Sequence, residues 1–417
     1  MAVQPSSSLL RCERRFCPKI LVGTSALIVM LFWILPAQAQ TLTVLHTFSG
    51  GDGQYPYSGV AIDAGGRLYG TTSRGGANQN GVVYELKHVN SAWVETILQN
   101  FGSGAGGFLP EAAPVFGPSG ILYGTTLLGG SGQNGVLYSL RPPATVCTAV
   151  SCPWMESVLW AFQGFDTDGA NPANGALTFD SSGNGYDTTS EGGSSNNGTV
   201  YEISKQGGQW TETVLYSFGT GQNDGTMPLH NVVLDSAGNL YGTTYTGGTM
   251  GGGTVFELSP SGSNWTERII ANFPAGSAPQ AGLIIDRAGN LYGATDGVGT
   301  SSAEVFELSP SGSNWTLTAL HTFSTNIYDI GPVGNLVMDH SGNLYGATYT
   351  LGAHSKGNIF ELSPSGNSWT YTDLYDFTGG SDGSGPMGDL NMDSSGNLYG
   401  TTQLGGNGYG VVWELVL

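Results

Sequence analysis

A short segment that recurs seven times constrains the fold of this 417-residue chain more than any other feature. Its clearest copy reads Gly-Asn-Leu-Tyr-Gly-Thr-Thr, at residues 238–244. A regular period of about fifty residues indicates a repeat architecture. The central tyrosine returns at intervals of 54, 63, 55, 51, 53 and 54 residues, as Tyr69, Tyr123, Tyr186, Tyr241, Tyr292, Tyr345 and Tyr399.

Each repeat unit contains four short apolar segments separated by turn residues. In the fourth unit they are residues 229–235, 239–244, 254–258 and 265–273, which we name strands a, b, c and d. These segments are rich in β-branched and aromatic residues, and no segment of the chain shows a sustained helical period. The spacing from the strand b tyrosine to the strand c aromatic residue is 14 or 15 residues in every unit, which is typical of a hairpin of fixed length.

Four antiparallel strands in a unit of about fifty residues match one blade of a β-propeller. We therefore predict an all-β fold, a seven-bladed β-propeller with four antiparallel strands per blade. Residues 41–48 have the pattern of a lone strand d, and the sequence stops just after the seventh strand c. The N-terminal strand should therefore complete the last blade and close the ring, with residues 40–417 as a single propeller domain.

Carboxylates that recur in almost every unit are expected to be structural, because a single active site would not need six copies. An aspartate precedes the a-to-b turn in six units, and a glutamate lies in strand c in six units. The second unit lacks both, with Gly117 and Ser139 in their places, and in the third unit Asp187 replaces the glycine that follows the tyrosine. The recurring residues are Asp63, Asp180, Asp235, Asp286, Asp339 and Asp393, and Glu85, Glu202, Glu257, Glu307, Glu361 and Glu414.

Residues 1–39 are predicted to be a cleaved signal peptide. Four basic residues between positions 11 and 19 precede an apolar run at 20–35, and Ala37-Gln38-Ala39 fits a signal peptidase site. The run is shorter than the roughly twenty residues needed to span a bilayer, which disfavours the alternative of an uncleaved anchor. We expect a monomeric extracellular protein without a stable membrane anchor, and the periplasm is the alternative location.

Charge and cysteine content narrow the range of partners. Loss of residues 1–39 removes four basic residues and one acidic residue, which changes the formal charge from -19 to -22. Such acidity disfavours a nucleic-acid partner.

Outside residues 1–39 the chain has two cysteines, Cys147 and Cys152, in an insertion of the second unit. In an exported protein this close pair is predicted to form a disulfide rather than a metal site.

Function is expected where residues break the sevenfold pattern. The d-to-a and b-to-c loops, which should emerge on one face, hold most of the variation in length and the unmatched charges. Four d-to-a loops contain Asp-Gly-x-x-Pro, and tyrosines in the same loops could stack on a sugar or a peptide. The candidate ligand-binding residues are Asp52, Asp168, Asp224, Asp382, Tyr55, Tyr245 and Tyr349, with Tyr57 and Phe108 in the same set of loops.

The sequence requires no cofactor and suggests no catalytic residue. Asp166 and Asp168 resemble the start of a calcium loop, but the later ligands of such a loop are missing, so calcium stays an open alternative. Fingerprints of serine hydrolases, zinc proteases and nucleotide-binding loops are absent. The six histidines show no spacing that groups them as ligands, so we expect each to have a surface or packing role: His46, His88, His230, His321, His340 and His354.

The repeated Gly-Asn-Leu-Tyr-Gly-Thr-Thr, Gly-Gly and Gly-Thr-Val-Phe-Glu-Leu segments resemble the GloVer-type tandem repeat of exported bacterial proteins, often described as choice-of-anchor proteins. The resemblance covers residues 41–417. It implies an extracytoplasmic repeat protein of unassigned activity, often followed by a C-terminal sorting signal. This chain ends on its last predicted strand, so we expect release rather than surface retention. NHL-type and gluconolactonase-type propellers are similar at the level of the fold, which transfers no active site.

Two hypotheses about function follow from the sequence. The first is a secreted binding or interaction module that holds a glycan, peptide or protein ligand through the face formed by the d-to-a and b-to-c loops. The alternative is an extracytoplasmic enzyme, a metal-assisted hydrolase or lyase with its site at the central channel. The enzyme hypothesis predicts unmatched carboxylates that converge on the ring axis, and the residues favour the binding module.

Overall fold

The computed structural model describes residues 40–143, 154–164, 168–172, 174–297, 301–323 and 329–417. Cys147, Cys152 and Asp166 lie outside these ranges, so the disulfide and one of the two proposed calcium ligands stay predictions. Residues 40–417 form one compact unit. Within the described ranges, no helix has the length and apolar character needed to cross a membrane.

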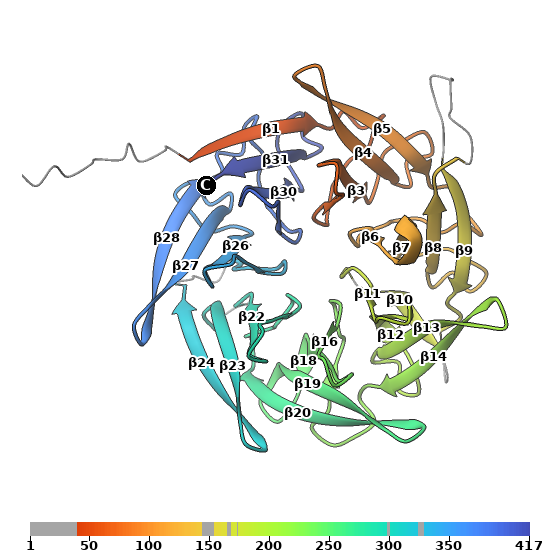
Figure 1. Cartoon of the computed structure of the whole chain (residues 1–417), viewed down its shortest axis with the longest axis vertical. Coiled ribbons are helices and arrows are strands. Elements are labelled where there is room, and N and C mark those ends of the chain that lie inside the picture. The colour runs from red at the N-terminus through yellow and green to blue at the C-terminus, as the bar shows by residue number, and fades with distance from the viewer. Residues whose placement is uncertain (1–39, 144–153, 165–167, 173, 298–300, 324–328) are drawn as a thin grey trace, which may run out of the picture. The chain divides into compact units, whose positions relative to one another are not determined.

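Seven antiparallel sheets form a ring, which confirms the predicted seven-bladed β-propeller (Figure 1). Blade 1 comprises β2 (Ala61–Ile62), β3 (Leu68–Thr72), β4 (Val82–Val89) and β5 (Ala92–Asn100). Blade 2 comprises β6 (Val115–Phe116), β7 (Leu122–Thr126), β8 (Val136–Arg141) and β9 (Met155–Ala161). Blade 3 comprises β11 (Thr178–Phe179), β12 (Gly185–Gly192), β13 (Thr199–Gln206) and β14 (Gln209–Ser217). Blade 4 comprises β16 (Val233–Leu234), β17 (Leu240–Thr244), β19 (Gly251–Ser261) and β20 (Asn264–Pro274). Blade 5 comprises β21 (Ile284–Ile285), β22 (Leu291–Thr295), β23 (Glu304–Ser311) and β24 (Asn314–Thr322). Blade 6 comprises β25 (Val337–Met338), β26 (Leu344–Thr348), β27 (Asn358–Ser365) and β28 (Ser368–Asp376). Blade 7 comprises β29 (Asn391–Met392), β30 (Leu398–Thr402), β31 (Val411–Val416) and β1 (Thr41–Thr47).

The closing strand lies where the sequence predicted it. Strand β1 pairs antiparallel with β31, from Thr41 opposite Val416 to Thr47 opposite Val411. The last blade therefore combines three strands from the C-terminal end of the unit with one from its N-terminal end. Figure 1 shows β1 at the outer edge of this blade, in the position that β5 and β9 occupy in blades 1 and 2.

Strand a is shorter than predicted. In blade 4 the expected strand at 229–235 reduces to Val233–Leu234, because the residues before it turn toward the ring axis. The His230 carbonyl there accepts a hydrogen bond from Thr188 Oγ1 of the neighbouring blade at 2.7 Å. In the described residues the one helical segment is the 3₁₀ turn η1 (Pro118–Gly120), where blade 2 has Gly117 in place of the turn aspartate.

Two sets of loops meet on one face, as expected. Short extra strands join two of the d-to-a loops to the chain that follows strand b: β10 (Gly169–Pro172) pairs with β12, and β15 (Gly225–Thr226) pairs with β18 (Thr246–Gly247). Isolated bridges such as Gln54 with Arg74 and Ser384 with Leu404 do the same in other blades. These pairings tie each of these d-to-a loops to the chain that follows strand b in the same blade.

The repeated tyrosine and aspartate form a hydrogen-bonded pair in every blade except blade 2, and in three blades the glutamate joins them. In blade 4 the Tyr241 hydroxyl donates to Asp235 Oδ2 at 3.1 Å, and Asp235 Oδ1 accepts from the backbone N–H groups of Ala237 and Asn239 at 2.8 Å each. The tyrosine-to-aspartate bond occurs in six blades. In blades 1, 6 and 7 the hydroxyl also lies within hydrogen-bonding distance of the strand c glutamate. The structural role predicted for these residues is confirmed.

The hydrophobic core lies between the blades, as seven clusters of buried residues. In five of these interfaces the strand b tyrosine packs against a tryptophan from strand d of the next blade. Their ring centroids lie 5.7 to 6.5 Å apart: Tyr69 with Trp154, Tyr123 with Trp210, Tyr186 with Trp265, Tyr241 with Trp315 and Tyr292 with Trp369.

The glycine after the tyrosine leaves room for the aromatic residue of strand c. A Cβ atom on Gly242 would lie 2.5 Å from Phe256 Cζ, which is far inside contact distance. Blade 3 departs from this rule, because Asp187 lies opposite Tyr201 and is fully buried. Neither carboxylate oxygen has a hydrogen-bond partner of good geometry. Burial raises the pKa of Asp187 well above its usual value, so the fold favours the neutral carboxylic acid.

This buried acid makes stability depend on pH. Burial raises the pKa of Asp187 in the folded state above its unfolded value of about 3.9. The free energy of unfolding is therefore highest below this unfolded pKa, and it falls as pH rises toward the folded pKa. We expect Asp187→Asn to raise the melting temperature at pH 8 by at least about 2 °C and to change it little at pH 4. Thermal unfolding across this pH range measures the effect. Glu191→Gln, at an exposed position of the same strand, should follow wild type, and parallel profiles for Asp187→Asn and wild type would contradict the prediction.

Candidate functional site

A proline marks the same point in all seven d-to-a loops, and the three residues that follow it lead to the ring axis. The proline ring packs over the glycine before strand c of the preceding blade: a Cβ atom on Gly253 would lie 2.7 Å from Pro279 Cδ. This contact fixes the direction of the residues after the proline. The prolines are Pro56, Pro110, Pro172, Pro228, Pro279, Pro332 and Pro386.

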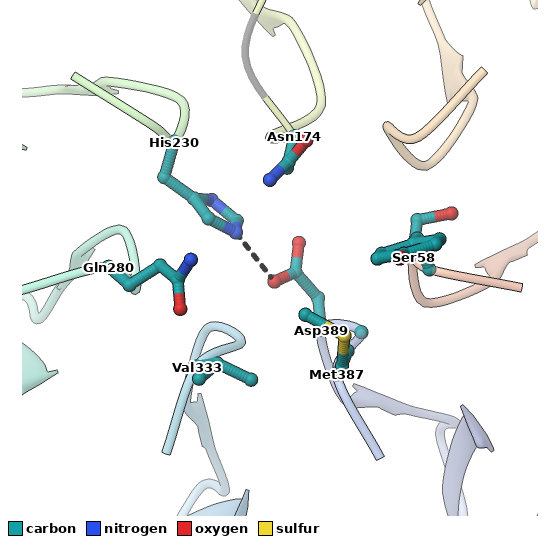
Figure 2. Close-up of a pocket in the computed structure, with 9 residues that line it drawn as sticks. Ser58, Asn174, His230, Gln280, Val333, Met387 and Asp389 are labelled. Atoms are coloured by element: carbon teal, nitrogen blue, oxygen red, sulfur yellow. Dashed lines mark ion pairs between the residues drawn. The ribbon is translucent and has the colours of Figure 1, made fainter. Parts of the chain in front are cut away.

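The residues after these prolines line a small pocket at the ring centre, which we name the axial pocket (Figure 2). Its free volume is about 20 Å³, enough for about one water molecule. A sugar ring does not fit in this space. The lining residues are Tyr57, Ser58, Asn174, His230, Gln280, Val333, Met387, Gly388 and Asp389.

A polar network crosses the axial pocket and joins three blades. His230 Nε2 of blade 4 lies 3.4 Å from Asp389 Oδ1 of blade 7, and the backbone N–H of Asn335 in blade 6 donates to the same oxygen at 2.7 Å. Asn231 Oδ1 lies 3.0 Å from His230 Nδ1 and accepts from Asn335 Nδ2 at 3.1 Å. Both ring nitrogens of His230 thus face oxygen atoms of neighbouring side chains.

Sequence reasoning missed this network. It treated His230 as one of several scattered histidines and did not single out Asp389. The two residues belong to different repeat units, and nothing in their separation along the chain indicates contact. A usable signal was present, however: the tripeptide after the repeated proline differs in every unit, for example Leu-His-Asn at 229–231 and Met-Gly-Asp at 387–389.

The four candidate loop aspartates lie at four different blade interfaces, so the structure does not bring them together. Each carboxylate accepts hydrogen bonds from its own d-to-a loop. Asp224, for example, accepts from the Gly219 N–H at 2.8 Å and from the Tyr216 hydroxyl at 3.0 Å. The corresponding bonds bring Gln163 N–H and Gly169 N–H to Asp168, Thr378 N–H and Tyr375 hydroxyl to Asp382, and Ser49 N–H to Asp52.

Such bonds are those of a turn-forming residue, and they occupy both oxygens of Asp168. The ligand-binding role of the four aspartates, and the calcium role of Asp168, therefore remain predictions without support from the geometry.

Five side chains from blades 1, 2, 6 and 7 gather beside the axial pocket: Tyr57, Arg74, Glu111, Tyr349 and Gln403, which we name the mouth cluster. The Tyr349 hydroxyl donates to Gln403 Oε1 at 2.8 Å. Burial raises the pKa of Tyr57, and the nearby Glu111 and Tyr349 add to this rise. Burial also raises the pKa of Glu111 to about 7, although Arg74 opposes the shift. Tyr57 lines the axial pocket as well, so the two features adjoin.

Of the four tyrosines that the sequence placed in these loops, Tyr57 and Tyr349 belong to the mouth cluster, and Tyr55 and Tyr245 do not. Tyr245 holds the position in blade 4 that Tyr349 holds in blade 6, but its neighbour is Asp296, whose pKa burial raises to about 7. Tyr55 has a φ of 58° and builds its loop, because its N–H donates to the Tyr409 carbonyl at 2.9 Å.

The axial network should contribute to stability. His230→Ala is expected to lower the free energy of unfolding by about 1–3 kcal/mol, because Asp389 and Asn231 each lose a buried partner. Urea unfolding measures this change. His354→Ala, at an exposed position, serves as the control and should leave the midpoint unchanged. A His230→Ala protein as stable as wild type would show that the network carries no structural role.

Several solved structures are similar to this chain at low sequence identity. A polysaccharide lyase, Uly1, is 10% identical over 89% of this chain and 91% of its own, with a TM-score of 0.50. A protein from Lactobacillus plantarum is 15% identical over 81% and 88% of the two chains, with a TM-score of 0.51. An ulvan lyase bound to a GlcA(1-4)Rha3S ligand is 9% identical over 78% and 86%, with a TM-score of 0.50. At these identities the likeness shows the fold alone.

Sequence comparison gives the family. No curated protein matches the chain. The pattern of the Gloeobacter/Verrucomicrobia repeat matches residues 29–153, 154–331 and 303–417, which together cover every blade of the ring. The resemblance seen in the repeated segments is thereby confirmed, and the chain belongs to the Gloeobacter/Verrucomicrobia repeat family.

Proposed function

We propose that this chain is an exported binding module and that its ligand is a neutral glycan held at the mouth cluster. One observation carries the proposal: side chains that break the sevenfold pattern come from four blades and meet at a single place beside the ring axis. Export is the expectation from residues 1–39. The mouth cluster lies among the d-to-a and b-to-c loops, where the sequence predicted the ligand-binding surface.

The chemistry of the mouth cluster suits a polyhydroxylated ligand. Tyr57 and Tyr349 combine an apolar ring face with a hydroxyl group, so they can contact both the C–H groups and the hydroxyl groups of a sugar. Arg74, Glu111 and Gln403 supply planar groups that donate and accept hydrogen bonds. Aromatic walls with a few fixed polar groups are typical of small-ligand sites.

Net charge favours an uncharged glycan. The chain carries a formal charge of -19, and this field repels polyanions. Within the mouth cluster the single cation, Arg74, is close to Glu111. The anionic saccharide named for the ulvan lyase is a ligand of that protein, and no residue match transfers it to this chain.

An enzyme is the second candidate, and one observation favours it. His230 and Asp389 are acid–base groups that break the repeat pattern and meet on the axis, where the enzyme hypothesis predicts several unmatched carboxylates. Asp389, however, is the one carboxylate that lines the axial pocket within the described residues, and the space beside it holds about one water molecule. A glycan at the mouth cluster would not reach this pair without movement of the loops, so we place catalysis second.

The binding function is tested by removing the two tyrosine rings. In an array of neutral and anionic glycans, wild type should bind neutral members, and the double variant Tyr57→Ala, Tyr349→Ala should bind at least about tenfold more weakly, since loss of two contacts at about 1 kcal/mol each exceeds that factor. Tyr349→Phe keeps the ring and loses only the bond to Gln403, so it should keep most of the affinity. Isothermal titration with the best array member gives the numbers.

Leu404→Ala is the matched control, because Leu404 is 40% exposed and adjoins Gln403 in the same loop. It should bind as wild type does. Unchanged binding by the double tyrosine variant, with an unchanged melting temperature, would refute the mouth cluster as the site. Cleavage of a bound glycan that His230→Ala abolishes would instead favour the enzyme.

A further inference from the structure

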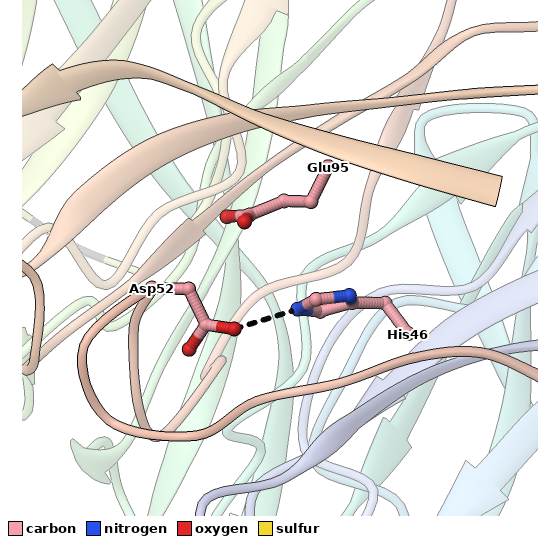
Figure 3. Close-up of side chains that lie close together, drawn as sticks. All are labelled: His46, Asp52 and Glu95. Carbon is pink, nitrogen blue, oxygen red and sulfur yellow. Dashed lines mark ion pairs between the residues drawn. The ribbon is translucent and has the colours of Figure 1, made fainter.

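The interface between blades 7 and 1 holds three side chains with metal-ligand chemistry (Figure 3). His46 lies on the closing strand β1, Asp52 in the loop that follows it, and Glu95 on β5 of blade 1. One ligand atom from each residue lies within 4.8 Å of the other two. We name this group the seam site, because it lies where the ring closes.

We propose that the seam site binds one Zn²⁺ ion. An imidazole nitrogen with two carboxylate oxygens is a ligand set that suits zinc, whereas calcium takes six to eight oxygen ligands. Ligand atoms on a tetrahedral zinc ion lie about 3.4 Å apart, given metal–ligand bonds of about 2.1 Å. His46 Nε2 and Asp52 Oδ2 are already 3.2 Å apart, and the Glu95 side chain is long enough to supply the third ligand.

The repeat itself supplies the strongest argument. Two other interfaces keep the same aspartate and glutamate, as Asp168 with Glu212 and Asp224 with Glu267. At those interfaces the position of His46 is held by an aromatic donor. Trp160 Nε1 donates to Asp168 at 3.4 Å, and the Tyr216 hydroxyl donates to Asp224 at 3.0 Å. Of these three interfaces, the seam alone replaces the donor with a residue that can offer a lone pair to a metal.

The polar atoms at the seam are also poorly satisfied without a cation. Glu95 Oε1 is shielded from solvent and has no hydrogen-bond partner of good geometry, as is also true of Glu212 and Glu267 at the other two interfaces. His46 Nε2 is shielded as well, and its one close polar neighbour in the seam site is Asp52 Oδ2 at 3.2 Å. Asp52 Oδ1 accepts from the Ser49 N–H at 2.8 Å, which orients the carboxylate and leaves Oδ2 toward His46. The side chains of His46 and Asp52 are 18% and 22% exposed, so an ion has a path from solvent.

A bound ion would join the closing strand to a second blade. Strand β1 already pairs with β31 inside blade 7, and the ion would connect it through Glu95 to β5 of blade 1. Because the ligands come together only in the folded ring, Zn²⁺ would stabilise the native state. The melting temperature should therefore rise with Zn²⁺ concentration.

The test uses the whole chain after treatment with EDTA and its removal. Titration with ZnCl₂ in a calorimeter should show one equivalent bound, and the melting temperature should rise in parallel. His46→Tyr copies the arrangement of Tyr216 and Asp224, so it should abolish this equivalent while the metal-free melting temperature stays near that of wild type. Glu95→Gln should weaken binding at least tenfold.

The converse variant makes the test sharper. Tyr216→His places an imidazole beside Asp224 and Glu267, and it should add a second equivalent of Zn²⁺ to the wild-type stoichiometry. A wild-type chain that binds no Zn²⁺, or a His46→Tyr chain that keeps its full equivalent, would overturn the proposal. Failure of Tyr216→His to gain an equivalent would count against the inference that this position decides metal binding.

Discussion

The ring depends on the contact between a buried tyrosine of one blade and the strand d of the next. A single blade has apolar side chains on both faces and cannot cover them alone. The tyrosine ring and the facing tryptophan do so together, and burial of each large side chain is worth roughly 1.5–3 kcal/mol. The hydroxyl enters the core without penalty because Asp235 and its counterparts accept its hydrogen bond. Since each blade covers only its neighbour, all seven are satisfied only when the ring is closed.

The scaffold was predictable from the sequence because its residues recur. Tyr241, Asp235 and Glu257 have copies in most units, and repetition separates a structural role from a catalytic one without any structure. The extent of strand a was not predictable, since apolar residues before Val233 continue the pattern although the chain has already turned toward the axis. The same reasoning about repetition, applied to Asp224 and the other loop aspartates, would have favoured their turn role, because they too occur in several units.

The candidate sites were less predictable, because they are made by contacts between units. Tyr349 was identified as a loop tyrosine that could stack on a ligand, but its partners in the mouth cluster come from three other blades. His230 and Asp389 lie in variable tripeptides after repeated prolines, and only the circular arrangement brings them together. His46 was expected to have a surface or packing role, because its contact with Glu95 joins strands of two different blades that the linear sequence does not bring together. In each case the scaffold recurs from blade to blade, and the residues of the site vary at a few positions of each blade.

The pairing of β1 with β31 also sets the order in which the molecule can be assembled. Thr41 leaves the ribosome early, whereas its partner Val416 is among the last residues of the blade to be made. Until then the apolar residues Leu42 and Val44 lack their place in the blade 7 core, and the edge of β31 that β1 will cover does not exist. Strand β1 therefore has no partner until β31 has been made, and an unpaired strand is open to edge pairing with other chains.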